Sequence, residues 1–375
     1  MVKRGGKKSK NERKDDDEVS TEMLSSALGE EVASIQERRI QSLWAGYGTI
    51  SRLHLSPSGG TVIVKRVMPP RGEDGVSHQR KLHSYQVEAE FYRSVAPRFL
   101  EAVRAESGHQ GGPLFAGVPT PHHVSSDSDR FVFVLSDLEP LYPEDGGLSK
   151  TQTWTALKWL AAFHACFWEA DEAGLWAEGS YWHFETRQDE WHSMGRSWAR
   201  LHDAAPGLDR RIQGLDRGGG ANRSRRNRTL VHGDPKSANI MCTQDGNSCG
   251  MYDFQYCGGG FGSRDLVYML VSSCPSRTLD TSFNEMLQFY HDELCQRLPA
   301  AKAADFPLAE LEMQFDLCLL DYVRFMAGWG MWGNTSWANR RADQILTKID
   351  GGKAMSPDEY TEAIYQLYPL NGLAG

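Results

Sequence analysis

Two carboxylates and one amide lie where they could support phosphoryl transfer. Asp234 and Asn239 belong to the stretch L-V-H-G-D-P-K-S-A-N-I-M, and Asp253 follows in M-Y-D-F-Q. Transfer to a hydroxyl uses one carboxylate to accept or orient the hydroxyl proton, and an Asn and an Asp to hold magnesium against the nucleotide phosphates. The order and spacing therefore predict Asp234 as the catalytic carboxylate, and Asn239 and Asp253 as magnesium ligands.

The segment between these two ligands is predicted to be a β-hairpin. Ile240–Cys242 and 249–252 have strand character, and Asp245-Gly-Asn247 between them is a strong turn signal. A hairpin returns the chain, so that Asn239 and Asp253 would lie at the same end and could share a cation. Magnesium commonly takes one or two protein carboxylates together with substrate phosphates, so this small set of ligands is sufficient.

Lys236 lies between the predicted base and the first predicted metal ligand. From there its ammonium group could reach the transferring phosphate and offset its growing charge. A single His-Gly-Asp would more often be an ordinary turn, so the prediction depends on the whole string. We therefore predict Asp234 and Lys236 as the catalytic pair.

The string H-G-D-P-K-S-A-N-I-M followed by D-F-Q resembles the aminoglycoside phosphotransferase and choline kinase-like superfamily, close to its ecdysteroid kinase-like branch. The resemblance covers about residues 43–368. It implies that Asp234 is the catalytic base, that Asn239 and Asp253 bind Mg²⁺, and that ATP is the donor. The motifs depart from those of protein kinases in two ways. His-Gly-Asp replaces His-Arg-Asp, which favours a small-molecule acceptor. Asp-Phe-Gln replaces Asp-Phe-Gly, which argues against the conformational flip that this segment makes in protein kinases.

The nucleotide-binding part is expected to begin near residue 40. Gly46 and Gly48 lie in L-W-A-G-Y-G-T-I, which reads as strand, turn and strand, and they would let backbone amides approach phosphates. Thr61–Lys65 is a β-rich run, typical of the kinase strand whose lysine holds the α- and β-phosphates. The alternatives are an ordinary hairpin turn for the glycines and a lysine on an edge strand for Lys65.

A helix over 78–95 should carry the acidic partner of Lys65. Glu88 and Glu90 are both candidates, and the family's E-x-x-F-Y pattern favours Glu88. The run 130–135 is predicted to be a buried strand. By resemblance, its end at Leu135 and Ser136 is the hinge whose backbone binds adenine.

The remainder is predicted to be mainly helical. His164 is expected to be a satisfied core residue within a helix over 150–169. Trp182, His183 and Arg187 could contact the acceptor, or they could pack the helical core. Gly214–Arg228 and the glycines of 258–262 are expected to be mobile segments.

Composition limits the class of protein. The chain has 375 residues, of which 40% are hydrophobic, and a net charge of −8. This charge argues against general nucleic-acid binding, which favours a basic surface, and no apolar run is long enough to span a bilayer. Seven cysteines without paired metal-ligand spacing indicate reduced thiols in a cytoplasmic protein. Cys242 and Cys249 could face each other across the hairpin, and two buried thiols are expected there.

The expected fold is α+β and protein-kinase-like. Residues 1–38 would be a disordered charged tail, whose basic cluster could also direct the protein to the nucleus. Residues 39–137 would form a nucleotide-binding lobe with a small antiparallel sheet, and 138–375 a larger helical catalytic lobe.

The expected function is ATP-dependent phosphorylation of a small-molecule alcohol. The alternatives are a protein kinase, disfavoured because no A-P-E segment follows a long activation loop, and an inactive nucleotide-binding interaction module. The acceptor and the oligomeric state are not identified by the sequence.

Overall fold

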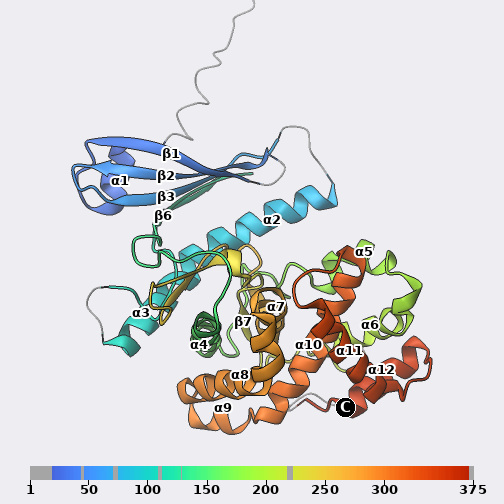
Figure 1. Ribbon diagram of the computed structural model, residues 1–375. Coiled ribbons are helices and arrows are strands. Elements are labelled where there is room, and N and C mark those ends of the chain that lie inside the picture. The colour runs from blue at the N-terminus through green and yellow to red at the C-terminus, as the bar shows by residue number, and fades with distance from the viewer. Residues whose placement is uncertain are drawn as a thin grey trace, which may run out of the picture. The chain divides into compact units, whose positions relative to one another are not determined.

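A computed structural model describes residues 19–43, 46–70, 75–108, 112–127, 129–217 and 223–370. The chain divides into two compact units, one formed by 1–85 and 120–137 and the other by 86–119 and 138–375. Figure 1 shows a sheet in the first unit and mostly helices in the second. The α+β class, with a small antiparallel sheet preceding a mainly helical part, is confirmed.

The first unit is a five-stranded antiparallel sheet with strand order β1-β2-β3-β6-β5. Its strands are β1 (Ser34–Ser42), β2 (Gly48–Ser56), β3 (Thr61–Val67), β5 (Pro121–Asp127) and β6 (Arg130–Ser136). Helix α1 (Thr21–Leu28) packs on this sheet (Figure 1). Alternating valines of β3 and β6, such as Val64 and Val134, form the core under α1 together with Leu24.

The N-terminal boundary differs from the tail expected over 1–38. Ser20 caps α1, because its hydroxyl accepts a hydrogen bond from the Met23 amide, and such a cap stabilises a helix start. Leu24 is fully buried. The expected disorder is therefore wrong for residues 19–38, and the basic cluster discussed above lies outside the described residues.

The second unit contains most of the helices. They are α3 (Ala96–Ser107), α4 (Lys150–Cys166), α5 (Gln188–His192), α6 (Ala199–Ile212), α7 (Ser263–Ser273), α8 (Ser276–Arg297), α9 (Ala300–Ala304), α10 (Leu308–Trp329), α11 (Thr335–Asp350) and α12 (Pro357–Leu367). Helix α2 (Val76–Glu90) begins in the first unit and continues through a π-helical turn, η2 (Phe91–Val95), into α3. Helix α4 packs against α8, and α10 packs against α6 and α7.

Residues 86–119 group with the second unit, although they were expected in the nucleotide-binding part. The reason is aromatic packing onto α4. Phe91 lies 6.3 Å from Phe163 between ring centroids, and Phe99 lies 5.2 Å from both Trp159 and Phe163. Burial of large rings is a strong stabilising contribution, so it fixes this stretch to the helical unit.

Two small sheets complete the second unit. One has the order β4-β9-β8, formed by β4 (Ala116–Gly117), β8 (Ile240–Cys242) and β9 (Cys249–Met251). The other pairs β7 (Thr229–Val231) with β10 (Gly258–Gly260). The glycines of β10 were expected to be mobile, but they are buried. A side chain at Gly258 would collide with the Trp176 carbonyl, so close packing explains the glycine there.

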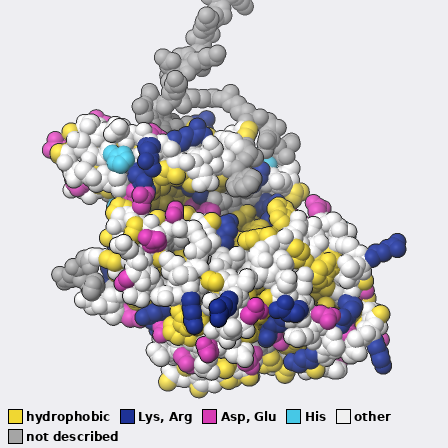
Figure 2. Space-filling model, viewed as in Figure 1, with side chains coloured by type: hydrophobic (Ala, Val, Ile, Leu, Met, Phe, Trp, Pro, Cys, Tyr) yellow, Lys and Arg dark blue, Asp and Glu magenta, His cyan; other side chains and the backbone are white. Residues whose placement is uncertain are grey.

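No helix in the described part of the chain combines the length and apolar character needed to cross a membrane. On the face shown in Figure 2, acidic and basic side chains are interspersed, and apolar side chains gather between them.

Candidate active site

The carboxylate of Asp234 is the centre of the site. Its Oδ2 accepts hydrogen bonds from Lys236 Nζ at 2.7 Å and from Asn239 Nδ2 at 3.0 Å. Its Oδ1 is buried and has no hydrogen-bond partner in the described residues. Burial is the largest influence on this group and raises its pKa to about 6, while the Lys236 ammonium lowers it and the Asp253 charge raises it. One oxygen is thus held, and Oδ1 has no partner within hydrogen-bond distance, although the nearby Tyr268 hydroxyl also lowers the pKa of this carboxyl.

The loop carrying Asp234 is fixed by a second carboxylate beneath it. Asp265, in the first turn of α7, accepts hydrogen bonds from the backbone amides of His232 at 2.6 Å and Gly233 at 2.9 Å. Asp265 also contacts His164 Nε2 at 3.1 Å, and His164 Nδ1 lies 2.7 Å from the Tyr290 hydroxyl. Both ring nitrogens of the buried His164 therefore have partners, which is the satisfied core histidine expected.

Gly233 is required by the shape of this loop. Its φ is +85°, a left-handed conformation that favours glycine. A Cβ at this position would stand far inside contact distance of the Tyr256 carbonyl oxygen. The backbone itself thus explains why glycine precedes Asp234 in this chain.

The two predicted metal ligands are joined through the confirmed hairpin of β8 and β9. The Tyr252 amide donates to the Asn239 carbonyl at 3.1 Å. His232 reinforces this connection, because its Nδ1 accepts from the Asp234 amide at 3.2 Å and its Nε2 contacts the Tyr252 carbonyl at 3.1 Å. Burial lowers the pKa of His232, so the ring is neutral and Nε2 is the donor. The loop and the segment at Asp253 are held in one hydrogen-bonded arrangement.

Asp253 has a φ of +68°, which is uncommon for a residue with a side chain. Phe254 anchors this turn, since its ring stacks on Phe91 at 3.6 Å and lies 4.4 Å from the His232 ring. Such backbone strain persists where surrounding packing enforces it, and it is frequent at functional sites.

The donor set fits magnesium. Asn239 directs its Nδ2 to Asp234, which leaves its Oδ1 as the atom that can face a cation. The Asp253 charge is close enough to raise the pKa of both Asp234 and Lys236. One carboxylate and one amide oxygen beside a second carboxylate are hard oxygen ligands of the kind that magnesium prefers.

Lys65 is buried in the centre of the sheet of the first unit. Its ammonium lies 5.4 Å from the Tyr85 ring centroid and 5.9 Å from that of Phe133. Glu88 is buried in α2 and belongs to the second unit. Because the two residues fall in different units, their ion pair stays a prediction.

The predicted glycine turn and hinge also lie in the first unit. Gly46 and Gly48 have φ of +73° and +148°, and a side chain at Gly48 would collide with the Arg66 carbonyl of β3. Residues 44 and 45 of this segment lie outside the described residues. At the end of β6, the amide of Ser136 donates to the Thr120 carbonyl at 2.9 Å. The backbone amide of Ser136 is therefore already hydrogen-bonded within the protein. Adenine binding by the backbone of Leu135 and Ser136 stays a prediction.

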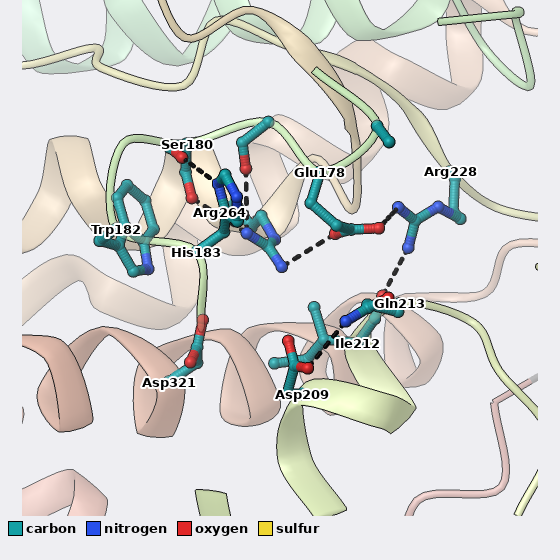
Figure 3. Close-up of polar contacts among 12 residues, drawn as sticks. Glu178, Ser180, Trp182, His183, Asp209, Ile212, Gln213, Arg228, Arg264 and Asp321 are labelled. Carbon is teal, nitrogen blue, oxygen red and sulfur yellow. Dashed lines mark hydrogen bonds and ion pairs between the residues drawn. The ribbon is translucent and has the colours of Figure 1, made fainter. Parts of the chain in front are cut away.

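Two of the residues predicted to contact the acceptor are interior. The Trp182 ring is fully buried and lies 5.1 Å from the Tyr268 ring. His183 Nδ1 lies 2.8 Å from the Ser180 carbonyl, and burial lowers the pKa of His183 to about 3, so the ring is neutral. Figure 3 shows both side chains among buried polar contacts. Their positions support a packing role more than contact with an acceptor.

Arg187, the third of these residues, stacks under an aromatic surface. It donates to the Tyr181 carbonyl at 2.7 Å and pairs with Glu190 at 3.2 Å. Its guanidinium lies 5.3 Å from the Trp329 ring and 5.5 Å from the Phe325 ring. Arg187 therefore supports rings of α10, and its contact with an acceptor stays a prediction.

A buried ion-pair network holds the segment after residue 178 and was not predicted (Figure 3). Glu178 pairs with Arg228 and, at 3.0 Å, with Arg264 of α7. Arg264 also donates to the Ser180 hydroxyl at 2.9 Å. Arg228 was expected in a mobile, solvated loop, and this expectation is wrong for Arg228, because Glu178 compensates its buried charge.

The sequence analysis also missed two tyrosines beside the Asp234 carboxylate. The Asp234 charge contributes to raised pKa values of Tyr268 and Tyr181, although burial is the larger cause. Their rings lie 5.6 Å apart. Tyr268 follows Asp265 by three residues in α7, and residues spaced in this way share one face of a helix. That spacing could have indicated that Tyr268 lies near the site. No residue pattern around Tyr181 indicated that it approaches Asp234.

A family model matches residues 54–173 and 183–303, which is more than half of the chain. The chain belongs to the ecdysteroid kinase-like family. Members of this family are kinase-like small-molecule phosphotransferases that act on hydroxyl groups. None of the curated proteins matches this family member.

Several solved structures are similar at low identity. A microcompartment-associated aminopropanol kinase is 16% identical, with 94% of this chain and 99% of that chain covered and a TM-score of 0.45. Spectinomycin phosphotransferase in complex with ADP and spectinomycin is 13% identical, with 92% and 97% covered and a TM-score of 0.43. Choline kinase from Cryptosporidium parvum is 11% identical, with 90% and 92% covered and a TM-score of 0.45. At these values no residue role is transferred from them.

Proposed function

We propose that this member of the ecdysteroid kinase-like family transfers the γ-phosphoryl group of ATP to a hydroxyl of a small molecule, with Mg²⁺ as cofactor. The observation that carries the proposal is the Asp234 carboxylate, with one oxygen held by Lys236 and Asn239 and the other unpartnered. A hydroxyl donor placed at Oδ1 would satisfy this buried acceptor. Family membership and the spacing of the motif support the same reaction.

Each residue then has one role. Asp234 orients the acceptor hydroxyl and takes up its proton, and its raised pKa suits a base that works near neutral pH. Lys236 is 34% exposed at its side chain, so its ammonium can leave Asp234 and offset charge on the transferring phosphate. Asn239 and Asp253 would hold Mg²⁺, which supplies charge neutralisation for the nucleotide phosphates.

The nucleotide would be held by the first unit. Lys65, oriented by Glu88, would bind the α- and β-phosphates, while the turn at Gly46 and Gly48 and the strand end at Leu135 and Ser136 would provide backbone contacts. This assignment rests on the sequence pattern and on the position of Lys65 in the interior of its sheet.

The acceptor would rest on an aromatic surface at the end of α10. Trp329, Met331 and Trp332 are exposed by 57%, 38% and 37%. The Trp332 ring lies 6.0 Å from that of Tyr268, which is next to Asp234. Exposed aromatic residues commonly line sites for small molecules, so we expect an alcohol with an apolar or ring-containing body.

The test measures thermal stability with and without Mg-ATP, followed by transfer of labelled γ-phosphate to a panel of small alcohols. We expect a magnesium-dependent rise in the melting temperature and a labelled product with at least one alcohol. Asp234→Ala should lower turnover by orders of magnitude and leave nucleotide affinity nearly unchanged, because base and positioning are lost while phosphate contacts remain. Trp337→Phe, on another surface, is the control and should retain activity.

The same experiment separates the alternatives. Labelled peptides without labelled alcohols would identify a protein kinase. Binding of Mg-ATP without transfer to any alcohol or peptide would identify an interaction module. Comparable turnover in the Asp234→Ala variant would overturn the proposal.

A further inference from the structure

Cys242 and Cys249 are directly opposite in the antiparallel pair of β8 and β9. Their amides do not bond each other, since Cys242 donates to the Glu144 carbonyl at 2.7 Å and Cys249 to the Phe115 carbonyl at 3.3 Å. They therefore form a pair not hydrogen-bonded to each other, in which Cα atoms typically lie about 4.5 Å apart and side chains share one face. This separation lies within the range of disulfides, about 4.4–6.8 Å. The backbone thus permits a bond without rearrangement.

The two thiols belong to directly opposed residues, and their pKa values are shifted in opposite directions. Cys249 is the largest influence on Cys242 and lowers its pKa, whereas burial raises the pKa of Cys249, whose thiol donates to the Thr155 carbonyl at 3.8 Å. A cysteine with a lowered pKa beside a second thiol is the arrangement found in cysteines that respond to oxidants. Both side chains are buried, so reaction would require a local opening of the hairpin.

The hairpin offers a place where such an opening can begin. An open groove of about 490 Å³ borders its turn and is lined by Pro113, Thr243, Gln244, Asp245 and Ser248. Thr243 and Ser248 are the neighbours of the two cysteines along the strands. Opening the hairpin from its turn would reach the cysteine pair once the hydrogen bond from the Thr243 amide to the Ser248 carbonyl is broken.

We propose that Cys242 and Cys249 are a reversible redox pair that closes to a disulfide when the protein meets a hydroperoxide. The Cys242 thiolate attacks the terminal peroxide oxygen and forms a sulfenic acid. The other oxygen leaves as hydroxide from hydrogen peroxide, or as alkoxide from an organic hydroperoxide, and is protonated to water or to an alcohol respectively. The Cys249 sulfur then attacks the Cys242 sulfur, and the sulfenic oxygen leaves as a second water. Two thiols lose two electrons and two protons in total, and the peroxide gains them.

The position of the bond gives it a consequence for the site. The hairpin begins after Asn239 and ends before Asp253, so the disulfide would tie together the two strands that lie between the predicted magnesium ligands. The redox proposal itself rests on the thiol pair and not on the proposed function. Its test therefore needs no substrate and succeeds or fails independently of kinase activity.

The test treats the folded full-length protein with hydrogen peroxide, unfolds it, alkylates the remaining thiols and maps the peptides. Cleavage before aspartate separates the neighbouring cysteines, because peptides beginning at Asp234, Asp245 and Asp253 contain Cys242, Cys249 and Cys257 respectively. We expect the peptides of Cys242 and Cys249 to be linked, and the alkylatable thiols to fall by two from the seven in the chain. A thiol reductant should restore both.

Matched variants assign the loss to this pair. Cys242→Ala and Cys249→Ala should each abolish the linked peptide, whereas Cys318→Ala, which removes a buried thiol of α10, should retain it. The proposal is overturned if both thiols of the wild-type protein remain alkylatable after peroxide. It is also overturned if either sulfur links to another cysteine, or if Cys242 proceeds to sulfinic acid without a linked peptide.

Discussion

Replacing Asp234 by Asn should make the metal-free protein more stable at neutral pH, although it removes the proposed base. Burial raises the pKa of Asp234 from its ordinary value of 3.8 to about 6. The folded state therefore holds a proton between about pH 4 and pH 6 that the unfolded state releases. Stability falls as pH rises through this window, because the folded state binds more protons there than the unfolded state. Asn carries no charge and does not have this pH-dependent cost.

The magnitude follows from the same values. A rise in pKa from 3.8 to about 6 corresponds to about 3 kcal/mol, at about 1.36 kcal/mol per pH unit. Asp234 is only 5% exposed, so solvent screening does not reduce this figure greatly. Protonated Asp and Asn are both neutral, so the unpaired Lys236 affects both in the same way. The free energy of unfolding of the variant, relative to wild type, should rise by about 3 kcal/mol between about pH 4 and pH 8.

The assay is urea unfolding of both proteins across this range, in buffer with a magnesium chelator. Asp245→Asn is the control, because Asp245 lies in the exposed hairpin turn and its hydrogen bonds to Thr243 and Asn247 lower its pKa. Because the pKa of Asp245 lies below its ordinary value of 3.8, this group does not titrate between about pH 4 and pH 8, and the stability of the control relative to wild type should stay constant over that range. A difference between wild type and Asp234→Asn that stays constant with pH, or falls, would refute the electrostatic argument.

Three further predictions concern the same site. Gly233→Ala should lower the free energy of unfolding by about 3 kcal/mol, because it adds a collision with the Tyr256 carbonyl to a positive φ; chemical denaturation measures this, and a loss below about 1 kcal/mol would contradict the close approach. Asp253→Asn should remove the magnesium-dependent stabilisation by ATP, which is about 2.7 kcal/mol for wild type at a ligand concentration of 100 Kd; an unchanged calorimetric shift would exclude Asp253 as a ligand. Turnover of the wild type should fall as pH drops below about 6, where Asp234 becomes protonated. In Lys236→Gln this fall should occur at a higher pH, because the cation that lowers the pKa of Asp234 is gone. A fall at the same or a lower pH would show that Asp234 is not the titrating base.

Local sequence predicted the hairpin and the short-range contacts of the site. Asp234, Lys236 and Asn239 are separated by only a few residues, so one loop brings their side chains together. The turn signal between Ile240 and Met251 set the register that returns the chain towards Asp253. Such contacts are predictable because a short loop and a tight turn have few alternative conformations.

Contacts between distant segments were not predictable in this way. Tyr181 approaches Asp234 because the segment after Glu178 is held by Arg264 of α7, which lies far along the chain. Arg228 looked like part of a solvated arginine-rich loop until its partner was known. A charged residue enters the interior only when an opposite charge compensates it, and a single sequence does not reveal which charge that is.

The sequence by itself determined the composition of the candidate site, the hairpin that joins its predicted metal ligands, and the glycine that precedes the predicted base. The tertiary structure decided the protonation of Asp234, the burial of Trp182 and His183, and the exposure of Trp329 and Trp332. The physical reason is the separation along the chain between the residues that interact. Turn geometry and spacing act over a few residues, whereas burial and charge depend on everything packed around a group, including segments more than a hundred residues away, such as His164 beside Asp265.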